Sequence, residues 1–530
     1  MTWYCAGTFG LYLCPGKKMH NTLNSTILLL SVCLLASCGG GGSENNTTTQ
    51  IPDDNDTIIA PAEPIENEHL SGGEASIKKV QSDAFSENSN NMVSVERKII
   101  FNLGDDFFNN PWVEGSASTS SRDGLGGLFN NNACQDCHIR DGRGHAPVDE
   151  NDTDFDSILF RTATTNISFE DEDLILQSLK GNVPDGYFGG QLQQHGISGV
   201  SPEVNLKVSY QNKVVTFTDG STVTLRDPTW TITSHNPEQS FEADTVFSAR
   251  VAPPMIGLGL LALISEADIL LKEDINDADA DGISGKANYV WSVSNQNVAL
   301  GRFGWKAGQP SILEQSAGAF VNDMGLTSRL HLNETCTEEQ NECLAAPNGN
   351  GDLINDYNFE VSDPILDAIA FYSSHLAVPE RRDAYSEQVL IGKALFQQAG
   401  CQACHTESYT TLIDQDQPEL SGQTIFPYTD LLLHDMGEDL VDFTPENEPA
   451  SADMLYEFLA TATEWRTPPL WGLGLTKTVD PKATFLHDGR ASTIMEAVLW
   501  HGGEAENAKN KVLAFNQEER AALLAFLNDL

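Results

Sequence analysis

The sequence predicts a mainly α protein in which two helical domains flank a β-rich insertion. Three observations support this fold class. The pentads CQDCH (134–138) and CQACH (401–405) repeat one motif in two distant parts of the chain. Apolar residues recur at helical spacing in the segments around the second pentad. Between the pentads, residues 203–233 alternate apolar and polar side chains, a pattern typical of strands.

Each pentad contains the residues that attach a haem covalently. Its two thiols can form thioethers with the haem vinyl groups, and the histidine that follows can bind the iron. The residues at these positions are Cys134, Cys137 and His138 in the first pentad, and Cys401, Cys404 and His405 in the second. A zinc site or a dithiol redox site also uses Cys-x-x-Cys, but neither explains a histidine directly after both pairs. The sequence therefore predicts two haem c groups, each in a cytochrome c-like domain.

The N-terminal residues are expected to form an export signal and a tether. The apolar run Ile27–Ala36 is too short for a stable membrane span. It leads into Ser37-Cys38-Gly39, which resembles the lipoprotein box in which Cys38 is lipidated after cleavage; an ordinary signal peptide cut nearby is the alternative. We expect residues 1–38 to be a lipoprotein signal peptide and the polar residues 39–95 a disordered tether. The protein would then face the periplasm from a lipid anchor, on the outer membrane.

The net charge limits the partners of the protein. It is −46 at pH 7, from 30 Lys and Arg against 76 Asp and Glu. Nucleic acid and anionic lipid surfaces would repel such a chain. The charge can serve solubility alone, or it can form an acidic docking surface for a basic electron donor such as a small cytochrome.

The first haem domain is expected to span residues 96–385 and to include the β-rich insertion, with Asp219-Gly220 as a hairpin turn. Asp277, Asp279 and Asp281 alternate before a glycine, as at the start of an EF-hand calcium loop. The twelfth loop position holds Asn288 rather than glutamate, so the alternatives are a Ca²⁺ site and an acidic Asx-turn loop.

Two cysteines remain outside the pentads and the first 38 residues. Cys336 and Cys343 lie between two stretches rich in polar residues and glycine. In an oxidising compartment we expect them to form a local disulfide.

The second haem domain is expected to span residues 386–530. Residues 386–397 have apolar side chains at helical spacing and are followed by Gly400, directly before the pentad. Near the end of the chain, Asn516 and Glu519 form a capping-box pattern at the start of another amphipathic helix. Two such helices crossing over a haem would close this domain.

Eight segments together resemble the bacterial di-haem oxidoreductases, described as peroxidases and sometimes labelled thiol oxidoreductases, which are related to di-haem cytochrome c peroxidases. The segments are GLGGLFNNNACQDCHIRDGRG, FGGQLQQHGISGV, RVAPPMIGLGLL, DADGISGKANYVW, GKALFQQAGCQACH, LLLHDMG, EWRTPPLWGLG and FLHDGRASTIMEAVLWHGGEA. The resemblance implies substrate chemistry at the N-terminal haem and electron relay through the C-terminal haem. The alternative is a di-haem electron carrier without catalysis.

The resemblance also suggests the residues around each haem. His501 occupies the position of the peroxidases' distal methionine and is the expected sixth ligand of the second haem, with Met436 as the alternative. Gln191, His195 and Arg250 are candidates for the acid, base and cation that peroxide cleavage needs at the first haem. Arg466 and Arg490 are expected to contact the haem propionates. Electron transfer or packing is expected of Trp465, Trp471 and Trp500. His145 is expected to lie at the surface.

Overall fold

The computed structural model describes residues 59–530, except 116, 120, 165–180, 350–357 and 453. Contacts divide the chain into two units, Met1–Thr57 and Ile58–Leu530. The predicted signal peptide with Cys38, and the tether as far as residue 58, lie outside the described residues. Everything below concerns the second unit.

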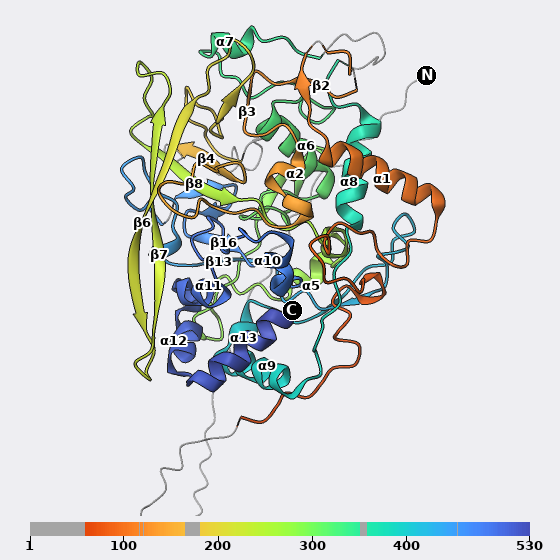
Figure 1. The fold of residues 1–530 in the computed structure, drawn as a ribbon, viewed down its shortest axis with the longest axis vertical. Helices are drawn as coiled ribbons and strands as arrows, with labels where there is room; N and C mark the ends of the chain where they lie inside the picture. The colour runs from red at the N-terminus through yellow and green to blue at the C-terminus, as the bar shows by residue number, and fades with distance from the viewer. Residues whose placement is uncertain (1–58, 116, 120, 165–180, 350–357, 453) are drawn as a thin grey trace, which may run out of the picture. The chain divides into compact units, whose positions relative to one another are not determined.

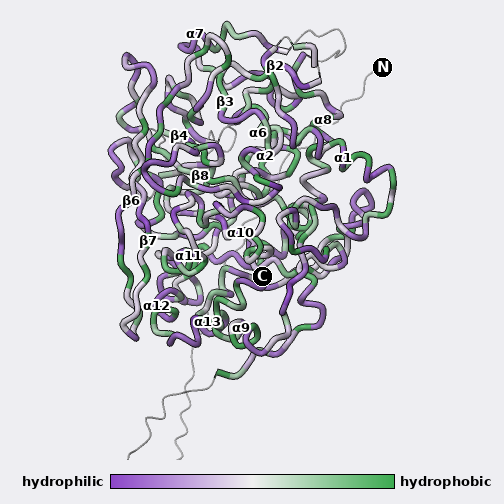
Figure 2. The backbone as a smooth tube through the Cα atoms, viewed as in Figure 1, coloured by the Kyte–Doolittle hydropathy of each residue, from purple (hydrophilic) through white to green (hydrophobic). Residues whose placement is uncertain are grey.

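The prediction of a mainly α fold is wrong, because the described residues are only 28% helical and 20% strand. No pair of cytochrome c-like domains is found in them, and residues 58–530 form one unit. Hydrophobic stretches occur throughout this unit instead of marking two separate helical blocks (Figure 2). Long irregular segments join the elements, and side-chain hydrogen bonds to the backbone fix many of them, which apolar periodicity does not reveal.

Three helices build the core beside the first pentad (Figure 1). They are α1 (Val95–Asn109), α6 (Ile312–Met324) and α8 (Asp363–His375). A side chain at Gly104 of α1 would collide with the backbone of Ala368 in α8, so glycine allows these two helices to pack closely. The pentad itself forms the short helix α2 (Cys134–Cys137), and ring contacts join His138 to Phe108 of α1. The first pentad therefore lies against a helical core.

The predicted β-rich insertion is a long hairpin. Strands β6 (Val204–Thr216) and β7 (Thr222–Ser234) pair antiparallel along their whole length. The turn contains Gly220 at φ +84, as the Asp-Gly pair predicted. The tip of the hairpin packs on the C-terminal helices: Phe217 belongs to their hydrophobic core, and the Thr218 N–H donates to the carbonyl of Leu513. The hairpin thus connects the regions of the two pentads, which explains why they do not form separate domains.

A second antiparallel pair carries charged residues toward the interior. Strands β4 (Ile158–Thr164) and β8 (Thr245–Val251) are paired so that Leu159 faces Arg250 in the register. Every residue of β8 is buried. Arg250 is therefore held inside the protein by a strand that is otherwise mostly apolar.

Helices α9 (Glu387–Ala399) and α13 (Gln517–Asp529) pack together beside the second pentad. The capping box of Asn516 and Glu519 is present, and Gly400 ends α9 at φ +92, as the sequence predicted. Helix α11 (Ile494–Trp500) and helix α12 (Glu506–Ala514) complete this region. The pentad begins directly after Gly400, in the 3₁₀ turn η4 (Cys401–Ala403).

The remaining elements are short. The helical ones are η1 (Gly73–Ala75), η2 (Ile139–Asp141), α4 (Leu258–Ala262), α5 (Glu266–Leu270), α7 (Asn341–Leu344), η5 (Glu438–Leu440), η6 (Leu473–Leu475), α10 (Thr476–Val479) and η7 (Gly503–Ala505). The strands are β1 (Val113–Glu114), β2 (Asp123–Leu125), β3 (Leu128–Phe129), β5 (His195–Gly196), β9 (Tyr289–Ser292), β10 (Asn297–Leu300), β11 (Tyr409–Thr410), β12 (Thr424–Ile425), β13 (Leu433–Asp435), β14 (Leu455–Glu457), β15 (Ala460–Thr461) and β16 (Glu464–Arg466). No helix among the described residues is long and apolar enough to cross a membrane.

Residues 59–94, which we call the strap, differ from the disordered tether that their composition predicted. The Ala62 N–H donates to Leu390 O at 3.0 Å, and the Phe426 N–H donates to Ser71 O at 2.8 Å. Phe85 is buried, and Glu68 is 0% exposed. The strap is folded because its polar groups find partners in the body, which composition alone cannot show.

Candidate active site

Both pentads line one continuous cavity of about 950 Å³. Cys134, Cys137 and His138 lie on its wall at one end, and Cys401, Cys404 and His405 lie on its wall at the other. All four thiols are free. The volume is at the upper end of the range for cofactor pockets, about 300–1,000 Å³. The arrangement can therefore hold two large groups in one enclosed space.

The two pentad histidines are fixed in the same way. His138 Nδ1 lies 2.8 Å from the carbonyl of Pro253, and His405 Nδ1 lies 2.9 Å from the carbonyl of Tyr428. Each carbonyl accepts the Nδ1 proton, which leaves Nε2 as a free lone pair for a metal. Burial lowers the pKa of both imidazoles to about 4, so both are neutral, the form that binds iron. The donors thus fit axial ligation of haem iron at each pentad.

Two buried arginines on the cavity wall donate to backbone carbonyls and form no direct ion pair among the described residues. Arg466 donates to the carbonyls of Gly304 at 2.8 Å and Thr467 at 3.1 Å. Arg143 donates to the carbonyls of Thr484 and Leu486. Burial lowers the pKa of Arg143 to about 9 and that of Arg466 to about 10. Two buried cations that form no direct ion pair are suited to the anionic propionates of haem, so the cavity passes this test for the cofactor.

Arg490 does not occupy the position that a contact with a haem propionate would need. Its Nε donates to Asp488 at 2.7 Å, and its guanidinium lies over the ring of Trp500. Arg490 is absent from the described lining of the cavity. This arginine therefore already has a counter-ion and a packing role, whereas Arg143, which the sequence analysis did not select, takes the expected place.

Both candidates for the sixth ligand of the second haem line the cavity. His501 follows α11, and its Nδ1 lies 2.8 Å from the carbonyl of Ala497, which again leaves Nε2 free. Met436 follows β13. The nearby histidine His434 is occupied on both nitrogens, by Asp430 at 2.8 Å and Glu504 at 2.6 Å. His501 thus has the same donor geometry as the two pentad histidines.

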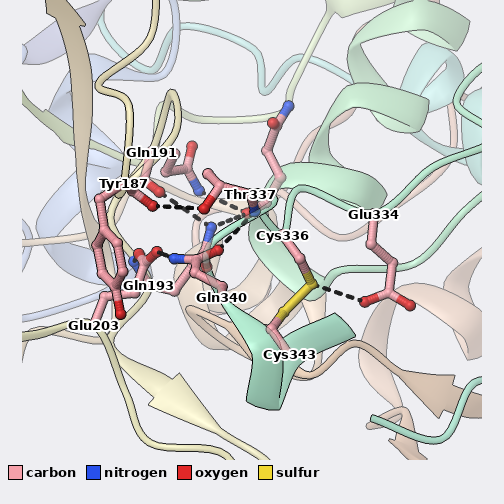
Figure 3. Close-up of a disulfide and its surroundings, with 10 residues drawn as sticks. Tyr187, Gln191, Gln193, Glu203, Glu334, Cys336, Thr337, Gln340 and Cys343 are labelled. Atoms are coloured by element: carbon pink, nitrogen blue, oxygen red, sulfur yellow. Dashed lines mark hydrogen bonds between the residues drawn. A yellow bond between two sulfur atoms is a disulfide. The ribbon is translucent and has the colours of Figure 1, made fainter. Parts of the chain in front are cut away.

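Of the three catalytic candidates, only Arg250 lines the cavity. Gln191 lies instead in a polar network beside the disulfide loop (Figure 3), where its amide donates to Asp323 and Asn130, each at 2.8 Å. His195 is exposed in β5, where it pairs with Phe129 of β3. Neither side chain is placed to meet a substrate in the cavity.

His145 is not a surface residue, contrary to the sequence-based expectation. It is buried, and its ring nitrogens lie 3.0 Å from Asp480 and 3.1 Å from Asp154. The histidine thus joins the loop after the first pentad to the segment that follows α10.

Glu457 is the functional candidate that the sequence analysis missed. It lines the cavity and accepts a hydrogen bond from Arg250 Nη1 at 2.6 Å. Burial alone would raise its pKa, but Arg250 and Arg161 hold that pKa below the usual value. Arg250 Nη2 is buried with no partner in the described structure. A lone glutamate gives no sequence signal of this kind, because the residues that meet it are far away in the chain.

His487 also faces the cavity. Its ring stacks on the indole of Trp465, with 3.5 Å between centroids and an angle of 11°. Lys306 Nζ lies 3.7 Å from the Trp465 ring centroid. Burial lowers the pKa of His487 to about 3. Of the three expected tryptophans, Trp465 and Trp471 line the cavity and Trp500 does not.

The cavity opens to solvent near the second pentad. The exposed residues of its lining are Asp281, Ala403, Asn507, Asn510, Lys511 and Ala514. Most belong to α12, and Ala403 lies within the second pentad. The lining residues around the first pentad are buried or half-buried. The lining near the second pentad is therefore more exposed than the lining near the first.

The acidic loop and the disulfide lie outside the pentads. Oxygen atoms of Asp274, Asp277 and Asp279 converge, whereas Asp281 turns to the cavity mouth. Backbone N–H groups of the loop bond to Asp277 and Asp279, as in Asx turns. The structure joins Cys336 to Cys343 in a disulfide, with 5.9 Å between the Cα atoms (Figure 3).

Comparison with solved structures gives weak similarities. A hydrazine synthase chain of Kuenenia stuttgartiensis has 13% sequence identity and a TM-score of 0.31, over 92% of this chain and 100% of its own length. The diheme peroxidase BthA of Burkholderia thailandensis has 15% identity and a TM-score of 0.24, over 62% of this chain and 93% of its own. TM-scores this low carry no argument about function. No curated protein matches the sequence.

The comparison with protein families is decisive. Residues 66–530 match the family described as "di-haem oxidoreductase, putative peroxidase". This range contains both pentads and the whole cavity, together with most of the strap. With two histidines presented to a shared cavity and buried cations beside them, the chain belongs to the di-haem oxidoreductase family.

Proposed function

We propose that this protein is a di-haem c-type peroxidase of the cell envelope. In this proposal a small oxidant such as hydrogen peroxide is reduced at the first pentad, and electrons enter through the second. The observation that carries the proposal is the asymmetry of the cavity. The lining around His138 is buried or half-buried, the lining around His405 is partly exposed, and the Arg250–Glu457 pair lies on the wall of the same cavity. Haem bound at each pentad would supply the redox chemistry.

The cavity wall carries two groups of the kind that peroxide cleavage requires. Two electrons and two protons convert one hydrogen peroxide into two waters, so a group must move a proton from one oxygen to the other. Because Arg250 and Arg161 keep its pKa low, the Glu457 carboxylate is ionised at neutral pH and can accept that proton. The unpaired Nη2 of Arg250 can stabilise the negative charge on the departing oxygen.

The open end suits electron entry. Its rim is formed mainly by small or uncharged side chains of α12 and the pentad, such as Ala403, Asn507 and Ala514. A redox protein can approach closely over such a rim, and the net charge of −46 would attract a basic donor such as a small cytochrome. We infer that a haem held by Cys401, Cys404 and His405 would supply one-electron chemistry at this end, and that electrons would reach the first pentad through it.

The location and the accessory groups belong to the same proposal. Covalent haem attachment takes place outside the cytoplasm, which agrees with an exported lipoprotein anchored through Cys38. A Ca²⁺ ion at Asp277 and Asp279 would stiffen the acidic loop beside the cavity mouth, and the Asx-turn loop remains the alternative.

The Glu457→Gln variant tests the catalytic assignment. Because the amide cannot accept the peroxide proton, we expect peroxide reduction to fall by about 10²–10⁴-fold. Reduction of the second haem by a small dye should stay unchanged. Glu464→Gln is the matched control, since Glu464 has a similar side-chain exposure, 15% against 14%, and an ion pair with Lys286 at 2.8 Å. Full peroxidase activity in Glu457→Gln would contradict the assignment, and no peroxide response in the parent protein would favour an electron carrier.

A further inference from the structure

The proximal histidine of the second pentad depends on a strained residue. His405 Nδ1 donates to the carbonyl of Tyr428, and Tyr428 has φ +54. For a bulky residue this region of backbone space is strained, and the conformation persists only where its surroundings enforce it. The carbonyl that orients His405 therefore needs an anchor elsewhere on Tyr428.

The Tyr428 hydroxyl provides that anchor. It donates to Glu68 Oε1 at 2.6 Å, and the two residues are 360 positions apart in the sequence. Tyr428 is 2% exposed and Glu68 is 0% exposed, so water does not compete for the bond. Glu68 belongs to the strap, which also accepts the Phe426 N–H through Ser71 O at 2.8 Å. The strap thus holds the segment 426–428 at two points.

Glu68 is itself fixed by buried cations. Its carboxylate pairs with Arg381 and, at 2.8 Å, with Lys393 Nζ. Arg381 also pairs with Asp529 at 2.8 Å, at the end of α13. Burial alone would raise the pKa of Glu68, but Arg381 and Lys393 hold that pKa below its usual value, so the acceptor stays ionised. This network gives Tyr428 a rigid, charged acceptor.

The first pentad uses a different device. The carbonyl that receives His138 Nδ1 belongs to Pro253, which lies in an Ala-Pro-Pro sequence. The proline rings restrict that backbone without help from a side chain. A change at Glu68 or Tyr428 should therefore act on one pentad only, and the other serves as an internal reference.

We infer that Glu68 and Tyr428 are positioning residues that set the strength of the His405 Nδ1–H···O=C bond and, through it, the reduction potential of the haem held at the second pentad. A strong bond at Nδ1 gives the imidazole more anionic character, which stabilises ferric iron and lowers the potential. The strap is then part of the redox tuning of this site. The inference rests on haem attachment at the second pentad, but it does not depend on peroxidase activity.

The Tyr428→Phe variant tests this inference in the full chain, produced with two haems attached. It removes only the hydroxyl, so the aromatic packing against Phe396 and Phe526 is retained. An optical redox titration should show a higher potential for the second haem and an unchanged potential for the first. The low-spin EPR signal of the second haem should change with it, because the imidazole is held less firmly. Glu68→Gln should shift the same haem in the same direction.

Tyr409→Phe is the matched control. Tyr409 is a buried tyrosine of the same region whose hydroxyl has no carboxylate partner among the described residues. We expect this control to leave both potentials unchanged. Parental potentials and EPR spectra in Tyr428→Phe, or an equal shift in Tyr409→Phe, would overturn the inference. A parent protein without two haems would instead refute the proposed function, so the two failures are distinguishable by haem content.

Discussion

Buried charges around the cavity fall into two groups. Arg250 pairs with Glu457 at 2.6 Å, and Lys306 pairs with Asp442 at 3.1 Å, so these cations keep a partner at all times. The hydrogen bonds of Arg143 and Arg466 go to backbone carbonyls, and neither arginine forms a direct ion pair among the described residues. An isolated buried charge is costly, which means that the second group favours an anionic ligand. In the proposed function, Arg250 and Glu457 would serve the chemistry, whereas Arg143 and Arg466 would hold the propionates of the cofactor.

The raised pKa of His145 predicts a specific pH dependence of the stability of the fold. Burial alone would lower its pKa, but the carboxylates of Asp480 and Asp154 raise that pKa above its usual value. A raised pKa in the folded state stabilises the protein fully below the unfolded value of 6.5, and this stabilisation is lost as pH rises through the folded value. The stability advantage of the parent over His145→Gln should therefore be largest near pH 6 and should shrink at higher pH. Thermal unfolding between about pH 6 and 9 measures it, and an advantage that grows with pH would contradict the assignment.

At the level of elements, the β6–β7 hairpin holds the two pentad regions together. Its tip packs into the core of α9, α11 and α13, and Arg520 of α13 pairs with Asp219 at the turn at 2.7 Å. The same hairpin emerges from the region of the first pentad, where Val208 and Trp230 are buried. Loss of its tip contacts should therefore weaken the whole folded unit.

Phe217→Ala tests this role. Phe217 is 4% exposed, and truncation of a buried phenylalanine costs about 3–5 kcal/mol. We expect a decrease of that size in the free energy of unfolding, measured by denaturant titration with both haems attached. Val214→Ala in the adjoining strand β6 is the control, because Val214 is 61% exposed and should change stability by less than about 0.5 kcal/mol. Equal effects of the two substitutions would contradict the role of the tip.

The elements also show what the sequence can and cannot predict. The pentads, the hairpin turn at Asp219-Gly220 and the capping box at Asn516 are local patterns, and each was found where it was expected. Glu457 and Glu68 act through partners hundreds of positions away, so no local pattern marks them. The strap was missed for the same reason, since its composition is that of a tether and its order comes from the surface it covers.

At the scale of the whole molecule, one cavity connects two chemically different ends. Trp465, Trp471 and Trp305 line it, so aromatic groups are available between the pentads. The lining is buried or half-buried around the first pentad and partly exposed around the second, where His405 and His501 lie on the wall. We propose that this division serves substrate reduction and electron entry at separate places, as a peroxidase fed by a protein donor requires.

The optical and EPR response of the mature, haem-loaded chain to hydrogen peroxide tests this account most directly. The protein is first reduced halfway, so that only the haem of higher potential carries an electron, and the haem content is measured in the same sample. The account predicts two haems per chain and a rapid spectral change at one of them, which the Glu457→Gln variant loses. A haem content other than two, or two low-spin haems that do not respond to peroxide, would contradict it.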